Sequence, residues 1–150
     1  MILESLLAYA HIAALLGMVV FISSEAALCR GEWLNAAVVE RLVRVDLLYL
    51  VATAAVALTG LARAFWGVKG ASWYWTDWLL HLKLALFVVV VLMSLRPAIA
   101  FRRWRAALRA GRGLPPADEV VATRRWVMRA AHLVPVIPLA AVFLARGYGH

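Results

Sequence analysis

Four long apolar stretches, separated by shorter polar segments, dominate the pattern along the chain. They cover about residues 2–28, 45–66, 75–95 and 126–145. A helix needs about 20 mostly apolar residues to cross the ~30 Å hydrocarbon core of a bilayer, and each stretch approaches that length. The pattern therefore predicts an all-α integral membrane protein, folded as a single four-helix bundle over residues 1–150.

The composition favours a lipid environment. Hydrophobic residues make up 65% of the chain, and the mean hydropathy is +0.85. Soluble domains contain about 45–50% apolar residues, and a short chain buries only a limited part of its surface. We therefore expect the lipid bilayer to cover the surplus apolar side chains.

The charged residues set the expected orientation. The chain carries 16 Lys and Arg against 8 Asp and Glu, a net charge of +8. Basic residues crowd the first–second and third–fourth connections, namely Arg30, Arg41, Arg44, Arg96, Arg102, Arg103, Arg105, Arg109, Arg112, Arg124 and Arg125. The opposite side has only Arg63, Lys69 and Arg146. Because Lys and Arg are enriched on the cytoplasmic side, both termini are predicted outside a bacterial inner membrane, and the basic charge needs no nucleic-acid partner.

The long connection between the third and fourth stretches has a pattern of its own. Residues 98–110 read as a basic amphipathic helix, with Phe101, Trp104 and Leu108 on one side. Such a helix is expected to lie on the anionic inner leaflet. The alternative is a docking surface for a partner.

Polar residues recur inside the apolar stretches at helical spacing. In the first stretch they follow a seven-residue repeat, which returns to nearly the same side of a helix: Glu4, His11, Met18 and Glu25. A similar stripe in the second stretch contains Asp46, Tyr49, Thr53, Gly60 and Arg63. Because polar groups in hydrocarbon are costly, both stripes are expected to face the interior of the bundle. In the fourth stretch, Pro135 and Pro138 predict a kink.

Depth sorts the histidines. At about 1.5 Å per residue, His11 lies ~13 Å from the outer face. His81 lies ~12 Å deep if its helix starts at Trp73, but only ~5 Å if it starts at Trp78. His132 falls in the inner half. His11 and His81 are therefore the candidate pair of metal ligands for an outer-half site.

Two histidines at one depth suit bis-histidine ligation of haem b, which helical bundles often hold. Arg63 and Lys83 are the candidate partners for its propionates or for an anionic substrate. His81 and Lys83 are about 200° apart around a helix, so one should face the core and the other the outside. The alternative is that the histidines only form hydrogen bonds between helices.

Several segments resemble, over nearly the whole chain, an uncharacterised family of small four-helix bacterial inner-membrane proteins. The matching segments are residues 3–11 (LESLLAYAH), 59–63 (TGLAR), 65–70 (FWGVKG), 82–86 (LKLAL) and 145–149 (ARGYG). The resemblance implies a fold and no reaction.

A more distant resemblance is to the membrane protoporphyrinogen IX oxidases, haem-b-binding bundles with a first-helix histidine and a Trp-Leu-His-x-Lys motif. His11 resembles the first feature, and residues 78–83 (WLLHLK) resemble the second with one extra residue. The resemblance implies essential roles for His11, His81 and Lys83. Copper-resistance-type membrane domains share a similar helix pattern.

Two functions follow as expectations. The first is a haem-b redox protein that oxidises a porphyrinogen or passes electrons to quinone. The alternative is a non-catalytic subunit or assembly factor that docks a membrane protein, or a second copy of the chain, through the Arg-rich loop. Metal-ion handling by His11, Met18 and His81 is a third option, without a sulfur-rich cluster to support it.

Overall fold

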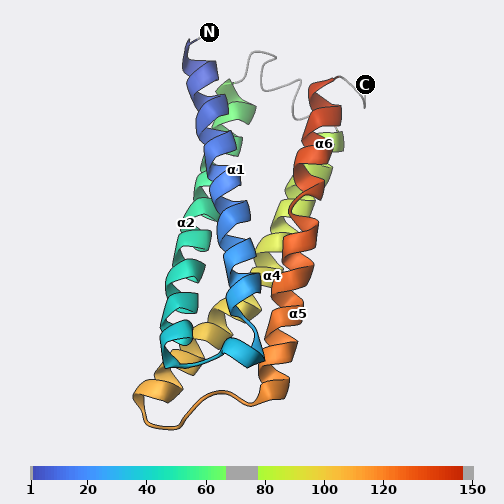
Figure 1. Ribbon diagram of the computed structural model, residues 1–150. Coiled ribbons are helices and arrows are strands. Elements are labelled where there is room, and N and C mark those ends of the chain that lie inside the picture. Colours follow the sequence, from blue (N-terminus) through green and yellow to red (C-terminus); the bar gives the residue numbers. More distant parts are fainter. Residues whose placement is uncertain (1, 67–77, 147–150) are drawn as a thin grey trace.

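The computed structural model describes residues 2–66 and 78–146 of the chain. Helices make up these two segments, and the described residues contain no strand. The elements are α1 (Ile2–Leu28), the short 3-10 helix η1 (Gly31–Trp33), α2 (Ala36–Trp66), α4 (Trp78–Arg109), α5 (Ala117–Leu133) and α6 (Val136–Ala145) (Figure 1).

Four segments are long and apolar enough to cross a membrane: Ile2–Leu28, Ala36–Trp66, Trp78–Arg109 and Ala117–Phe143. The last one joins α5 and α6 into one crossing. This confirms the predicted all-α architecture with four membrane-spanning helices.

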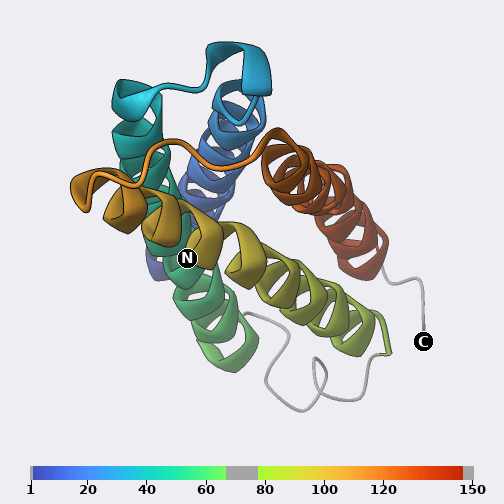
Figure 2. The same ribbon diagram turned by 90° about the horizontal axis from the view of Figure 1, so that it is seen from below.

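The helices run alternately up and down and form a ring. α1 packs against α2 and α5, and α4 packs against α2, α5 and α6 (Figures 1 and 2). The start of α1 and the end of α6 therefore lie at one end of the bundle, called here the terminal end. The opposite end, with η1 and the α4–α5 connection, is called the loop end. Which end faces the cytoplasm stays a prediction from the arginine distribution.

Helix α2 begins at Ala36, earlier than the predicted residue 45. Asn35 explains the earlier start, because its side-chain Oδ1 accepts a hydrogen bond from the Val38 N–H at 3.0 Å. This contact caps one of the unpaired donors of the first helical turn. The predicted start of the third span, at residue 75, lies outside the described residues.

Residues 98–109 are helical, as predicted, but they continue α4 through Pro97 to Arg109 and do not form a separate helix. A proline inside a helix removes one backbone donor, and the Ala- and Arg-rich residues that follow favour helix. Phe101 and Trp104 are 0% and 2% exposed, with ring centroids 5.5 Å apart. Their side of α4 therefore packs into the protein and does not lie on the leaflet.

The predicted break in the fourth crossing is confirmed. α5 ends at Leu133 and α6 begins at Val136, on either side of Pro135. The Ile137 N–H reaches the Val134 carbonyl in a tighter turn at 3.2 Å. The break starts a new helical segment that borders the site described below.

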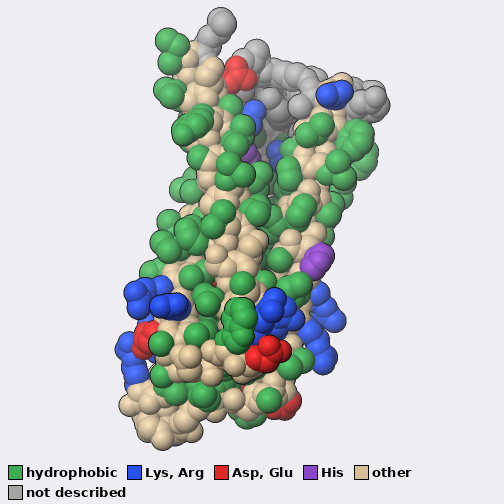
Figure 3. All heavy atoms as spheres, in the orientation of Figure 1, with side chains coloured by type: hydrophobic (Ala, Val, Ile, Leu, Met, Phe, Trp, Pro, Cys, Tyr) green, Lys and Arg blue, Asp and Glu red, His purple; other side chains and the backbone are tan. Residues whose placement is uncertain are grey.

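The core confirms the two predicted stripes over most of their length. Met18 and Glu25 of α1 are buried, as are Asp46, Tyr49 and Thr53 of α2. Apolar side chains cover the outer surface of the helices, while charged ones gather near the loop end (Figure 3). This division is what a bundle immersed in lipid requires.

Candidate ligand-binding site

A cavity of about 260 Å³ lies inside the terminal half of the bundle. Four helices supply its wall, which is aliphatic and aromatic except at two side chains, His11 of α1 and Lys83 of α4. The apolar part includes Leu15, Val56, Leu84, Phe87 and Ile137. In Figure 3, Lys or Arg and His side chains are visible in the hollow between α1 and α6 at this end. The cavity therefore combines an apolar wall with a few polar groups, the usual build of a small-molecule site.

The hydrogen bonds of His11 fix its tautomer. Its Nδ1 lies 2.8 Å from the Thr59 hydroxyl. That hydroxyl donates its one hydrogen to the Ala55 carbonyl at 2.6 Å, so its oxygen accepts from His11. The proton of neutral His11 therefore sits on Nδ1, which leaves the lone pair of Nε2 for a ligand.

Gly60 leaves space for the His11 ring to pack against α2. A Cβ atom built on Gly60 would lie 3.2 Å from His11 Cε1, closer than ordinary van der Waals contact. A side chain at position 60 would therefore press on the ring that Thr59 holds. The predicted stripes contain both residues, and the structure brings them together across the α1–α2 contact.

The cavity is positively charged. Lys83 lines it and is partly buried, and the half-buried Arg63 lies within electrostatic range of both Lys83 and His11. Neither cation joins an ion pair with a carboxylate of the described residues. A cation in an apolar environment without a partner is unfavourable. The site therefore favours an anion.

His81 and Lys83 divide between two sides of α4, as their spacing predicts. Lys83 lines the cavity, while His81 is exposed and contributes nothing to the described part of its wall. His132 is exposed on α5, where its Nδ1 donates to the Met128 carbonyl at 2.6 Å. The structure thus brings His11 and Lys83 together, with Arg63 nearby. Joint ligation by His11 and His81 stays a prediction.

The cavity suits a group smaller than a bis-histidine haem. Its described wall offers one imidazole, and pockets for drug-sized ligands usually measure about 300–1,000 Å³. Within residues 2–66 and 78–146, no group of three or more His, Cys, Asp or Glu side chains could hold a metal ion. We therefore derive no chemistry through a haem or a metal from this cavity.

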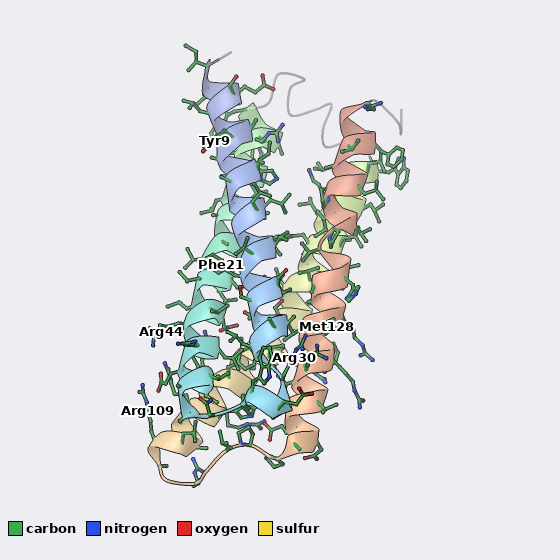
Figure 4. The ribbon with its side chains drawn as sticks, in the orientation of Figure 1. Tyr9, Phe21, Arg30, Arg44, Arg109 and Met128 are labelled. Carbon is green, nitrogen blue, oxygen red and sulfur yellow. The ribbon has the colours of Figure 1, made fainter. Side chains whose placement is uncertain are left out.

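Several arginines of the loop end contact other helices of the bundle. Arg109 at the end of α4 pairs with Glu40 of α2 at 2.9 Å, and Arg103 pairs with Glu119 of α5 at 2.5 Å. Figure 4 shows Arg109 at the foot of α4, beside the start of α2. The Arg96 guanidinium lies 4.6 Å from the centre of the Trp126 ring. Much of the segment predicted to dock a partner is thus engaged inside the chain.

Cys29 follows α1 and is fully buried. Burial raises the pKa of its thiol to about 12, so the reactive thiolate is rare at neutral pH. The residue acts as a small apolar side chain, as the sequence indicates.

A second group of polar residues is buried toward the loop end. The spacing of residues within each helix did not predict that these residues contact one another. Asp46 of α2 pairs with Arg102 of α4 at 2.9 Å. The Tyr49 hydroxyl lies 2.9 Å from Ser94 Oγ, and Ser94 donates to the Val90 carbonyl, so Tyr49 is the donor of that pair. The stripe on α2 identified Asp46 and Tyr49, whereas nothing in the pattern of α4 singled out Ser94.

Residues 3–149 match the model of a family described as "Predicted membrane protein (DUF2214)". No curated protein and no solved structure matches the chain. The distant resemblance to protoporphyrinogen oxidases and copper-resistance domains thus gains no support.

Proposed function

The chain belongs to the DUF2214 family of predicted membrane proteins, and we propose that its cavity binds a small amphiphilic anion. The ligand would carry an acidic group, a carboxylate or a phosphate, on a hydrocarbon body. The bilayer supplies such molecules to a site inside a membrane bundle.

The position of Lys83 in the cavity wall, without a carboxylate partner among the described residues, supports this proposal. The Lys83 side chain belongs to a wall that is otherwise apolar apart from His11, and its ammonium has no carboxylate partner in the described residues. Buried charges in proteins are usually paired, because an unpaired ion loses its hydration without compensation. An acidic ligand would provide the missing partner.

Each part of the cavity then has a role. Lys83 pairs with the acidic group, and the charge of Arg63 adds to the attraction. His11 Nε2 accepts a hydrogen bond from a hydroxyl or an acid proton of the ligand. The apolar wall holds the hydrocarbon part, which is small because the cavity measures about 260 Å³.

Haem b, for which the sequence predicts His11 and His81 as ligands, is a separate candidate, because the described cavity is smaller than a bis-histidine haem requires. His11 and His81 would be its axial ligands, with Arg63 and Lys83 at the propionates, and the group would supply electron transfer. Reduced-minus-oxidised spectra of protein made with added haem test this candidate. A spectrum without a Soret band removes haem and leaves the proposal of an amphiphilic anion standing.

Binding of octanoate and of its uncharged methyl ester by the purified protein tests the proposal. We expect Lys83→Met to weaken octanoate binding by about 30-fold or more, because loss of one partner of a buried pair costs roughly 2 kcal/mol at least. Binding of the ester should change little. Arg125→Gln, at an exposed position on α5, is the matched control and should bind octanoate like the wild type.

Two results would contradict the proposal. One is equal affinity of the wild-type protein for octanoate and its ester. The other is an affinity for octanoate that Lys83→Met leaves unchanged.

Docking of a partner through the Arg-rich segment stays a prediction, and the contacts of Arg102 and Arg103 within the chain do not support it. Its proposed test, neutral substitution of Arg102, Arg103 and Arg105, also removes two ion pairs of the bundle. Lost partners in that variant would therefore need a control for stability.

A further inference from the structure

Two carboxyl groups are buried together toward the loop end, away from the cavity. Glu25 of α1 is 3% exposed and Asp46 of α2 is 1% exposed. They lie close enough for the charge of Asp46 to act on Glu25. Both are therefore enclosed in a part of the protein where an unpaired charge is unfavourable.

The charges around the two carboxyl groups do not balance. Arg102 of α4 pairs with Asp46 Oδ2 at 2.9 Å, and the same Nη1 donates to the Ala98 carbonyl at 2.8 Å. Glu25 Oε1 is fully enclosed and has no hydrogen-bond partner. Arg102 is thus paired with Asp46, and Glu25 has no cation of its own.

The other groups near Glu25 do not supply the missing charge. Tyr49 of α2 is neutral and donates to Ser94, and Cys29 is a buried thiol. Arg124 of α5 acts electrostatically on Cys29, and its Nε is buried without a hydrogen-bond partner, but it forms no ion pair with Glu25. A metal ion lacks ligands, since the described residues hold no group of three or more suitable side chains. Among the described residues, Glu25 therefore has no cationic partner, and a proton on its own carboxyl group can neutralise it.

We propose that Glu25, beside the Asp46–Arg102 ion pair, is a proton-binding site of the bundle. The Glu25 carboxyl carries the proton as a neutral acid, while Asp46 stays ionised against Arg102. The burial of Glu25 and the charge of Asp46 both favour the neutral acid. A site of this kind lets the protein hold one proton inside its membrane-spanning part.

This proton site is separate from the cavity. Met18 lies between His11 and Glu25 on the stripe of α1 and is fully buried. Val90 of α4 is also fully buried, one turn before Ser94. Apolar side chains thus separate the two sites, and the proton site does not depend on the ligand proposed for the cavity.

Infrared spectroscopy of the protein in lipid at neutral pH tests the proposal. A neutral carboxylic acid gives a carbonyl stretch well above the carboxylate bands, and this stretch shifts to lower frequency in D2O. We expect the wild type to show this D2O-sensitive band and Glu25→Gln to lose it. Glu32→Gln, at an exposed position in η1, is the matched control and should keep it.

Thermal unfolding supplies a second readout. Glutamine resembles a neutral glutamic acid in shape and charge, so Glu25→Gln should leave Tm within about 2 °C of the wild type. An ionised Glu25 with an ionic partner would instead make this substitution lower Tm by roughly 6 °C or more.

Three results would overturn the proposal. The first is a wild-type spectrum without the acid band. The second is an acid band that Glu25→Gln retains. The third is a Tm of Glu25→Gln far below that of the wild type. The first needs no variant, so a failure of Glu25→Gln to fold does not prevent the test.

Discussion

At the scale of single residues, three positions shape the cavity: Thr59, Gly60 and Lys83. Thr59 orients His11 through its hydroxyl, and Gly60 leaves room for the ring. Lys83 adds a charge from the opposite helix. The cavity therefore depends on a small residue at position 60 as much as on its polar groups.

A comparison of two glycine substitutions tests the contact at His11. Alanine in a helix interior is favoured over glycine by about 0.5–1 kcal/mol when space allows. A Cβ on Gly17 would lie 3.8 Å from the Ala52 Cβ, an ordinary contact, whereas one on Gly60 would press on His11. We expect Gly60→Ala to be at least about 1 kcal/mol less stable than Gly17→Ala in reversible unfolding.

Equal stability of the two variants would contradict this account of His11. Octanoate affinity provides an independent check, because only Gly60→Ala should reduce it.

The sequence predicted these residues unevenly. Seven-residue spacing put His11 on the interior side of α1, and the two-residue spacing of His81 and Lys83 required that one of them face outward. Spacing within one helix cannot show which of the two turns inward, since that depends on the neighbours of α4. The contact between His11 and Gly60 likewise depends on how α1 and α2 cross.

At the scale of the helices, ion pairs of different depth join neighbouring elements. Asp46 and Arg102 connect α2 to α4 inside the bundle, with Asp46 1% exposed and Arg102 41% exposed. Glu40 and Arg109 connect the same helices at the surface, at 38% and 67% exposed. Depth, and not the number of pairs, should decide their contributions.

Substitution of one member of each pair tests this difference. We expect Asp46→Asn to cost about 2 kcal/mol of unfolding free energy, less than the ~3–5 kcal/mol of a fully buried pair because Arg102 reaches solvent. Arg109→Ala should cost at most about 1 kcal/mol, as surface pairs do. Denaturation of both variants in the same detergent measures the difference, and similar costs would show that depth does not matter here.

The helices themselves were largely predictable, and their ends were not. Apolar length identified four crossings, and Pro135 identified the break in the fourth. Asn35 starts α2 early through a side-chain cap that the apolar pattern does not include. Pro97 was compatible with a break, but the buried contacts of Phe101 and Trp104 keep α4 continuous.

At the scale of the whole molecule, the bundle separates two kinds of buried polarity. The terminal end holds a cationic cavity. The loop end holds two buried acids, of which Asp46 is paired with Arg102, and most of the charged surface. Fully buried Met18 and Val90 lie between them. Composition predicted the membrane and the stripes predicted a polar interior, but the cavity needed the arrangement of all four crossings.

Native mass spectrometry of the protein, released from its own membrane without added ligand, tests the central claim most directly. We predict that the wild type carries a bound acidic amphiphile, that Lys83→Met loses it and that Arg125→Gln keeps it. A wild-type protein without such a molecule, or the same molecule retained by Lys83→Met, would contradict the claim.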